Sequence, residues 1–414
     1  MAQDAVHTVL GSIDRKAMLS LAQELIKIPS FKTEETEVAR YLGDYFRQRG
    51  YAVQLQEVEP GRFQTIAILK GSGGGQSLMF NGHIDIDPLA FGWKRDPWIP
   101  QVEGDRLYGA GIRNMKGGVA AMIEAAEALR RSGIRLKGDL VLACVAGELQ
   151  GGVGTTYLCQ HGPLTDMAVV PEPNGAENIL TVHAGVAEMA IHTIGQSRHI
   201  SRMEDAIDAI EMMCQVIPAL KGVRFTHTPR PDLPGLPRLN VGAIIGGRGR
   251  NHDLRGPNFT CDFCTILVDV RFVPGMTSAS VKADIERVLE TLKAEDPNFQ
   301  YEIELPPPAS YKVNTVIMEP FELPSNAPIL EAVLRQYRHV TGREPTAVGV
   351  VLPGSYTGND TCHLWRAGVP CLLYGPGGGS ESANAPDEYT RISDMEQVAR
   401  VLALTALEVC NVPK

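Results

Sequence analysis

Apolar residues follow two different spacings along this chain of 414 residues. In the first half, short and mostly apolar runs, typical of buried strands, alternate with stretches of helical spacing such as 14–49 and 115–131. The strand-like runs are 51–57, 64–70, 77–82, 140–145 and 167–170. Strands that alternate with helices predict an α/β domain with a mainly parallel sheet and helices on both faces.

The pattern changes after about Gly185. The elements expected next are a strand at 186–193, a helix at 203–220, strands at 239–246 and 259–272, a helix at 278–294 and a strand at 299–305. This order is that of a ferredoxin-like α+β unit. Helical and strand-like runs then return at 327–340, 347–352, 370–374 and 393–409. We therefore expect a small domain at 186–306, inserted between the two parts, 1–185 and 307–414, of a larger one.

Composition narrows the classes of protein to consider. The net charge of −9 and the pI of about 5.6 provide no basic surface for phosphates, so nucleic-acid binding is not expected. The chain has no apolar stretch of about 18 residues and no basic start followed by an apolar run, so we expect neither a membrane span nor a secretory signal. Cys261 and Cys264 would point to opposite faces of a strand, and the scattered cysteines fit buried thiols in a cytoplasmic protein.

Six short segments combine glycine or proline with charged and amide residues. They are Gly82-His-Ile-Asp85, Tyr108-Gly-Ala-Gly-Ile-Arg-Asn-Met-Lys-Gly-Gly118, Gly147-Glu-Leu-Gln-Gly-Gly-Val-Gly154, Pro171-Glu-Pro173, Gly375-Pro-Gly-Gly378 and Asn384-Ala-Pro-Asp-Glu388. In this order and spacing they resemble the aminoacylase, acetylornithine deacetylase and succinyl-diaminopimelate desuccinylase family of two-zinc peptidases. The resemblance covers nearly the whole chain. It implies a catalytic domain formed by 1–185 and 307–414, and a lid domain at 186–306 that also makes a homodimer contact.

His83 and Asp85 stand at the end of an apolar strand. Alternation places both side chains on one face, and catalytic groups of open α/β sheets gather at such carboxyl ends of strands. The resemblance implies that His83 binds a zinc ion and that Asp85 orients its imidazole. It further implies that Glu148 is the general base and that Glu172 is a carboxylate ligand of a metal.

Three of the family's metal-ligand positions carry other residues here. Asn114 stands in place of the Asp that bridges both zincs, Leu149 in place of a Glu, and Asn384 in place of a His. One metal position loses all its ligands, while the other keeps His83 and Glu172 with only an amide as third partner. Because zinc sites need at least three good ligands, we expect no tightly bound cofactor. The alternative is one weakly bound zinc on His83 and Glu172.

The remaining site candidates are expected to bind substrate. The resemblance implies that His199 of the lid reaches the partner subunit's site and stabilises an oxyanion. Asn258 and Arg271 match the lid residues that grip a substrate carboxylate, a role that suits the planar fork of arginine. The alternative for Arg271 is an ion pair at a strand edge. Gly375 and Asn384 complete the set.

Three functions remain open. The first is a metal-independent enzyme that uses Glu148, Asp85, His83 and His199 for general acid/base chemistry, such as cyclisation, condensation, isomerisation or elimination. Its substrate would be a small carboxylate derived from an amino acid or resembling an N-acyl amino acid. The second is a metal-dependent amidohydrolase, deacylase or dipeptidase with an unusual single-metal site. The third is a binding protein without catalysis.

Overall fold

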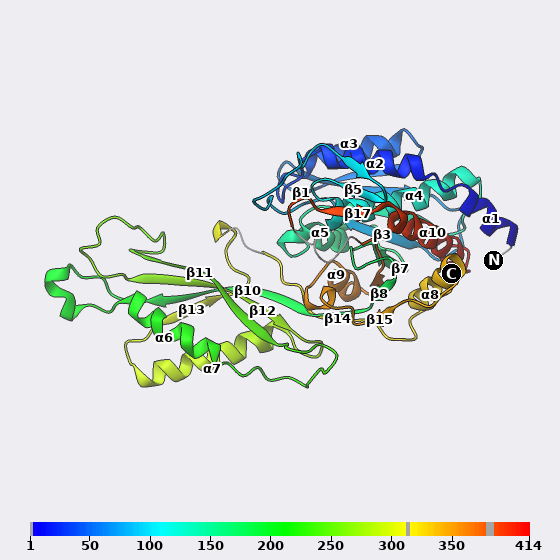
Figure 1. Cartoon of the computed structure of the whole chain (residues 1–414). Coiled ribbons are helices and arrows are strands. Elements are labelled where there is room, and N and C mark those ends of the chain that lie inside the picture. The colour runs from blue at the N-terminus through cyan, green and yellow to red at the C-terminus, as the bar shows by residue number, and fades with distance from the viewer. Residues whose placement is uncertain (1–2, 312–314, 378–384) are drawn as a thin grey trace. The chain divides into compact units, whose positions relative to one another are not determined.

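The computed structural model describes residues 3–311, 315–377 and 385–414. The chain forms two compact units (Figure 1). The first unit contains Met1–Val182, Glu322–Gly354 and Asn359–Lys414, and the second contains His183–Phe321 and Ser355–Gly358. The chain therefore enters and leaves the second unit twice.

The first unit is built on an eight-stranded sheet in the order β1-β2-β6-β3-β7-β16-β8-β15. Its strands are β1 (Ala52–Glu59), β2 (Arg62–Leu69), β3 (Leu78–His83), β6 (Leu140–Val145), β7 (Met167–Val170), β8 (Asn178–Leu180), β15 (Ala347–Gly349) and β16 (Cys371–Leu373). The central neighbours β6, β3, β7 and β16 are parallel, whereas β1 and β2 run antiparallel at one edge. All residues of β3, β6 and β7 are buried, as expected for parallel strands covered on both faces.

Helices cover this sheet. They are α1 (Gln3–Gly11), α2 (Arg15–Lys27), α3 (Thr36–Arg47), α4 (Gly117–Ser132), α5 (Val153–His161), α8 (Pro328–Thr341), α9 (Thr361–Arg366) and α10 (Ile392–Val409). Helix α4 packs on β3 and β6 and contacts α2 and α10, while α5 packs against α9. The predicted α/β fold class is confirmed.

Short strands form two further sheets that the sequence did not indicate. They are β4 (Gln101–Glu103), β5 (Arg106–Tyr108) and β17 (Tyr389–Arg391) in one sheet, and β9 (Val182–His183) with β14 (Phe321–Glu322) in the other. Strand β17 brings the segment that follows Glu388 next to β5, which leads into the segment carrying Asn114. The Glu388 carboxylate accepts a hydrogen bond from the Gly111 N–H at 2.6 Å, which fixes this junction.

The second unit is a four-stranded antiparallel sheet in the order β11-β12-β10-β13. Its elements are β10 (Gly185–Ile194), α6 (Ala209–Lys221), β11 (Arg238–Gly247), β12 (Phe263–Phe272), α7 (Ser278–Glu295) and β13 (Tyr301–Glu304). The chain order of strands and helices and their order in the sheet together make the ferredoxin-like arrangement. Strand β11 lies at the sheet edge.

All eight cysteines are free thiols. The Cys261 Sγ forms hydrogen bonds with backbone groups of Gly247 and Phe263. Cys264 is buried. Across the described residues, no helix combines the length and apolar character that a membrane crossing needs.

Candidate functional site

The end of strand β3 places His83 and Asp85 in the interior of the first unit. Both side chains are almost fully buried. The His83 Nδ1 lies 3.0 Å from the Asp85 carbonyl oxygen and 3.3 Å from its carboxylate. The Asp85 carboxylate also accepts hydrogen bonds from the backbone N–H groups of Glu148, at 3.2 Å, and Leu149, at 2.9 Å. Asp85 therefore ties the His83 imidazole to the turn that carries Glu148.

Three oxygen-bearing side chains surround the other nitrogen of His83. The His83 Nε2 lies 3.1 Å from Asn114 Oδ1, 3.7 Å from Glu172 Oε1 and 3.9 Å from Glu148 Oε2. Ligand atoms of His83, Glu148 and Glu172 all lie within 4.8 Å of one another. The structure thus brings these four residues together around one point.

The backbone that carries Glu172 packs closely against a glycine, Gly375. Glu172 follows β7, and a Cβ atom on Gly375 would lie 2.3 Å from the backbone of Pro171 and of Glu172. Gly375 is therefore needed for the close packing of this segment, whether or not it also touches substrate. Asn384 lies outside the described residues.

Several buried carboxyl groups gather at this point of the structure. Burial is the main cause that raises the pKa of Glu148 well above its usual range, with the charges of Glu172, Asp360 and Asp85 adding to it. Burial likewise raises the pKa of Glu172. Burial works against a charge on His83, but the hydrogen bond and charge of Asp85 raise its pKa well above the ordinary value. Buried like charges are costly without a compensating cation.

A divalent metal ion fits these donors. If the Nδ1 proton is donated to Asp85, the lone pair of Nε2 points at the oxygens of Asn114, Glu148 and Glu172. Zinc bonds of about 2.0–2.2 Å to nitrogen and oxygen place tetrahedral ligand atoms roughly 3.3–3.6 Å apart. The observed spacings of 3.1, 3.7 and 3.9 Å around Nε2 are near that range. The Leu149 side chain offers no ligand atom. The residue contributes only its backbone N–H, which donates to the Asp85 carboxylate.

Two residues of this region had no signal in the sequence. Asp360 is 1% exposed, and burial raises the pKa of its carboxyl to about 7. His363 lies on α9, and its Nε2 donates to the carbonyl of Gly151 at 2.7 Å. Asp360 and His363 come more than two hundred positions after the glycine turn that they contact, so only the folded chain reveals them. An Asp just before a short helix reads as a helix cap in a sequence.

The other candidates belong to the second unit and divide into two groups there. His199 and Asn258 are neighbours, because His199 pairs with Phe259 and the Ile200 N–H donates to the Asn258 carbonyl at 2.8 Å. Both side chains are exposed. Arg271 lies near the far end of β12, about 27 Å along the strand from its start at a rise of ~3.4 Å per residue. One small molecule cannot bridge that length.

Arg271 already has partners within its unit. Its guanidinium donates two hydrogen bonds to the Asp269 carboxylate, at 2.7 and 2.8 Å, and one to the Thr357 hydroxyl at 2.9 Å. A substrate carboxylate would therefore compete with Asp269. Its predicted role in substrate binding stays a prediction.

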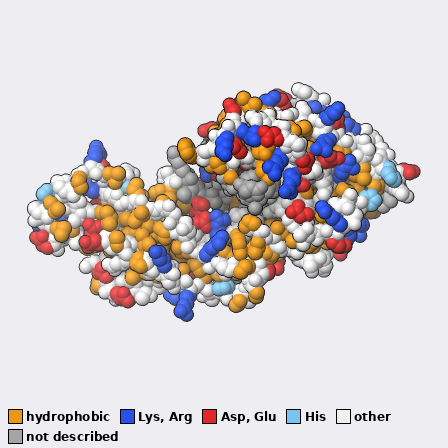
Figure 2. All heavy atoms as spheres, viewed as in Figure 1, with side chains coloured by type: hydrophobic (Ala, Val, Ile, Leu, Met, Phe, Trp, Pro, Cys, Tyr) orange, Lys and Arg blue, Asp and Glu red, His pale blue; other side chains and the backbone are white. Residues whose placement is uncertain are grey.

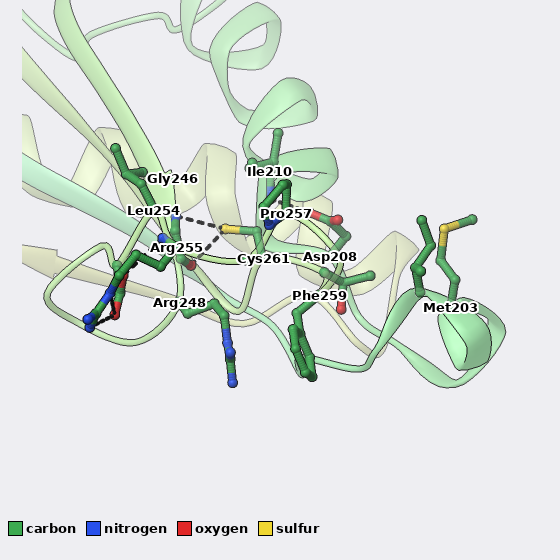
Figure 3. A pocket seen from close by; sticks show the side chains of 15 residues that line it. Met203, Asp208, Ile210, Gly246, Arg248, Leu254, Arg255, Pro257, Phe259 and Cys261 are labelled. Atoms are coloured by element: carbon green, nitrogen blue, oxygen red, sulfur yellow. Dashed lines mark hydrogen bonds and ion pairs between the residues drawn. The ribbon is translucent and has the colours of Figure 1, made fainter.

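A cavity of about 350 Å³ lies beside the His199 segment in the second unit (Figure 3). Its lining combines apolar side chains, among them Met203, Ile210 and Leu254, with charged ones such as Arg248 and Asp208. Arg248 lies over the face of Phe259, 4.1 Å from the ring centroid, and the His199 ring meets the same phenyl group edge-on. This cavity therefore borders the residue pair His199 and Asn258.

Comparison with known proteins identifies the family. Residues 79–408 match the model of peptidase family M20/M25/M40. This chain belongs to that family. It is 27% identical to N-formyl-4-amino-5-aminomethyl-2-methylpyrimidine deformylase of Halalkalibacterium halodurans, over 99% of this chain and 98% of the relative. It is 26% identical to acetylornithine deacetylase of Erwinia tasmaniensis, over 95% of this chain and 98% of the relative.

The fold is shared with solved members of the family. The YXEP protein of Bacillus subtilis, described as a dinuclear metal-binding peptidase from the M20 family, has a TM-score of 0.63 with 15% identity, covering 96% of this chain and 99% of that one. The chain is therefore an M20-family enzyme, and its deformylase and deacetylase relatives support amide hydrolysis over metal-independent chemistry.

The expectation that no cofactor binds was wrong. The family includes a dinuclear metal-binding peptidase, and His83, Glu148 and Glu172 form a group of potential metal ligands here. The error came from counting replaced ligand positions. The count left out how closely the oxygens of Glu172 and Asn114 approach the His83 Nε2, at 3.7 and 3.1 Å.

Proposed function

We propose that this chain is a metal-dependent amide hydrolase that removes a short acyl group, such as formyl or acetyl, from a small amine. The buried cluster around His83 carries the proposal, because the Glu172 carboxylate and the Asn114 oxygen lie 3.7 and 3.1 Å from the His83 Nε2, as donors to one divalent ion would, and the Glu148 carboxylate lies beside them. The relatives named deformylase and deacetylase support the substrate class. Since Leu149 provides no ligand, we propose one metal per chain rather than two.

The chain's own residues would then divide the work. The metal would supply the usual Lewis acidity, polarising the acyl carbonyl and lowering the pKa of a water molecule. His83 and Glu172 would hold the ion, with the Asn114 oxygen beside them. Glu148 would accept a proton from the attacking water and return it to the departing amine, since its carboxylate lies 3.9 Å from the His83 Nε2, beside the proposed ion. Asp85 would orient the His83 ring and fix the position of the turn that carries Glu148, because it contacts both.

The proposed function predicts a hydrolysis that depends on metal. Purified protein should release amine from at least one member of a panel of N-formyl and N-acetyl amines and amino acids. Dialysis against a chelator should abolish that release, and zinc, cobalt or manganese should restore it. The control is the same dialysis with the chelator already saturated by zinc. A turnover rate that survives complete removal of metal would contradict the proposal.

We further propose that the chain works as a homodimer joined through residues of the 186–306 region. Edge strand β11 exposes Ile244 and Ile245, at 54% and 42%, and an exposed apolar edge favours pairing with a second copy. Figure 2 shows apolar side chains gathered on the visible face of this unit. The separation of His199 and Asn258 from Arg271 supports two different sites, with His199 serving the site of the partner subunit.

The free cysteines support a reducing compartment, which we propose is the cytoplasm.

Subunit mixing tests this arrangement. His199→Ala and Glu148→Gln chains should each be nearly inactive, whereas a mixed population should recover activity. In a heterodimer one site would receive both a wild-type His199 and a wild-type Glu148, so a 1:1 mixture should recover roughly a quarter of wild-type activity. Mixing each variant with itself is the control. A monomer in light scattering, or no recovery on mixing, would contradict the dimer.

A further inference from the structure

The turn that carries Glu148 has an unusual backbone. It follows β6 and contains Gly147, Gly151 and Gly152, all with positive φ, at 69°, 94° and 89°. Such left-handed backbone favours glycine. The Gly151 N–H bonds to the Glu148 carbonyl at 2.8 Å, and the Gly152 N–H to the Gly147 carbonyl at 3.0 Å. Ordering a glycine-rich segment costs more conformational entropy than ordering other residues. The conformation of this turn therefore depends strongly on its contacts with neighbouring elements.

One side of this turn is held by the strand that carries His83. The Asp85 carboxylate accepts the N–H groups of Glu148 and Leu149, as described above. These two bonds fix the first half of the turn. The carbonyl of Gly151, in the second half of the turn, is bonded instead to His363 of α9.

Helix α9 holds the second half. A carbonyl oxygen only accepts, so the 2.7 Å contact requires a proton on the His363 Nε2. Burial lowers the pKa of His363, which keeps the ring neutral with that proton in place. A Cβ atom on Gly152 would lie 2.5 Å from the His363 ring and 2.8 Å from the Asp360 carboxylate. The turn and α9 are therefore packed in direct contact.

We propose that His363 is a positioning residue for Glu148, acting through its hydrogen bond to the Gly151 carbonyl. The inference rests on the proposed function, in which Glu148 moves the proton. Asp85 and His363 hold different backbone groups of the turn: Asp85 accepts the N–H groups of its first half, and His363 donates to a carbonyl of its second half. Loss of the second grip lets the glycine segment sample other shapes and carries the Glu148 carboxylate away from the point beside His83.

Two substitutions separate the hydrogen bond from the bulk of the ring. His363→Gln keeps an N–H donor close to the Nε2 position, whereas His363→Leu keeps volume and removes the donor. We expect His363→Leu to lower kcat by about 10- to 100-fold, the scale of a small misplacement of a reacting group. KM and metal content should stay within about twofold, because His83 and Glu172 are untouched. His363→Gln should recover most of the wild-type kcat.

A second measurement does not depend on activity. Hydrogen–deuterium exchange of the peptide that contains residues 147–153 should be about tenfold faster or more in His363→Leu, and close to wild type in His363→Gln. Should His363→Leu fail to fold, His363→Asn takes its place, because its amide is too short to reach Gly151. Equal kcat and exchange in all variants, or a Gln variant as impaired as the Leu variant, overturns the inference. A wild-type chain that hydrolyses no acyl amide overturns the proposed function, while the exchange comparison still decides the inference.

Discussion

Replacing His83 with alanine is expected to empty the metal site and to abolish hydrolysis. His83 lies at the centre of the cluster. Its Nε2 atom is 3.1 Å from Asn114, 3.7 Å from Glu172 and 3.9 Å from Glu148. Without the ring, two carboxylates and an amide remain, which suit zinc poorly. Bound metal should fall from about one ion per chain to below roughly a tenth, and kcat/KM by about 10³-fold or more.

Elemental analysis after gel filtration measures the metal, and amine release measures the rate. His339→Ala is the matched control, because His339 is an exposed histidine on α8. It should keep both metal and activity. A His83→Ala protein that retains a full equivalent of zinc would place the metal elsewhere and sink the proposed site.

The second large effect is expected for Glu148→Gln. Glutamine keeps the shape of the side chain but accepts no proton, so kcat should fall by about 10²-fold or more while KM changes little. The metal content should remain near that of the wild type, because His83 and Glu172 are intact. Glu34→Gln, at an exposed position of the same unit, is the control and should have no effect.

The metal content of Glu148→Gln also distinguishes two roles for this residue. A base leaves the ion in place when it is replaced, whereas a ligand takes the ion with it. Loss of metal in this variant would show that Glu148 binds the ion rather than accepting the proton. Turnover at the wild-type rate would remove Glu148 from the chemistry altogether.

The sequence predicted the architecture well because the main elements carry strong local signals. The buried runs that became β3, β6 and β7, and the periodic stretch that became α4, are each long enough to be recognised. Strands such as β5 and β17 contain three residues each, and their pairing joins segments that are far apart in the sequence. No local pattern encodes such a pair.

In the site, too, residues in recognisable sequence segments were predicted, whereas contacts between distant segments were not. His83, Asp85, Glu148 and Glu172 stand in recognisable segments, and the structure brings them together. The metal expectation failed because residue types were counted without their distances. His363 was missed because its partner, Gly151, contributes a backbone carbonyl, which no sequence pattern can reveal. Arg271 was assigned to substrate binding from the family resemblance, with an ion pair as the alternative, and the folded chain pairs it with Asp269.

The contact between Asp85 and the backbone of Leu149 has a consequence for how this enzyme can be altered. The N–H group at position 149 is engaged at 2.9 Å, while its side chain is partly exposed and is not used to hold the turn. Main chain and side chain therefore have separate tasks at this residue. The side chain can be exchanged, for a carboxylate or for a bulkier apolar group, while the scaffold that aims Glu148 keeps its shape. Position 149 is thus a natural entry point for redesigning the metal stoichiometry of the enzyme without rebuilding its fold.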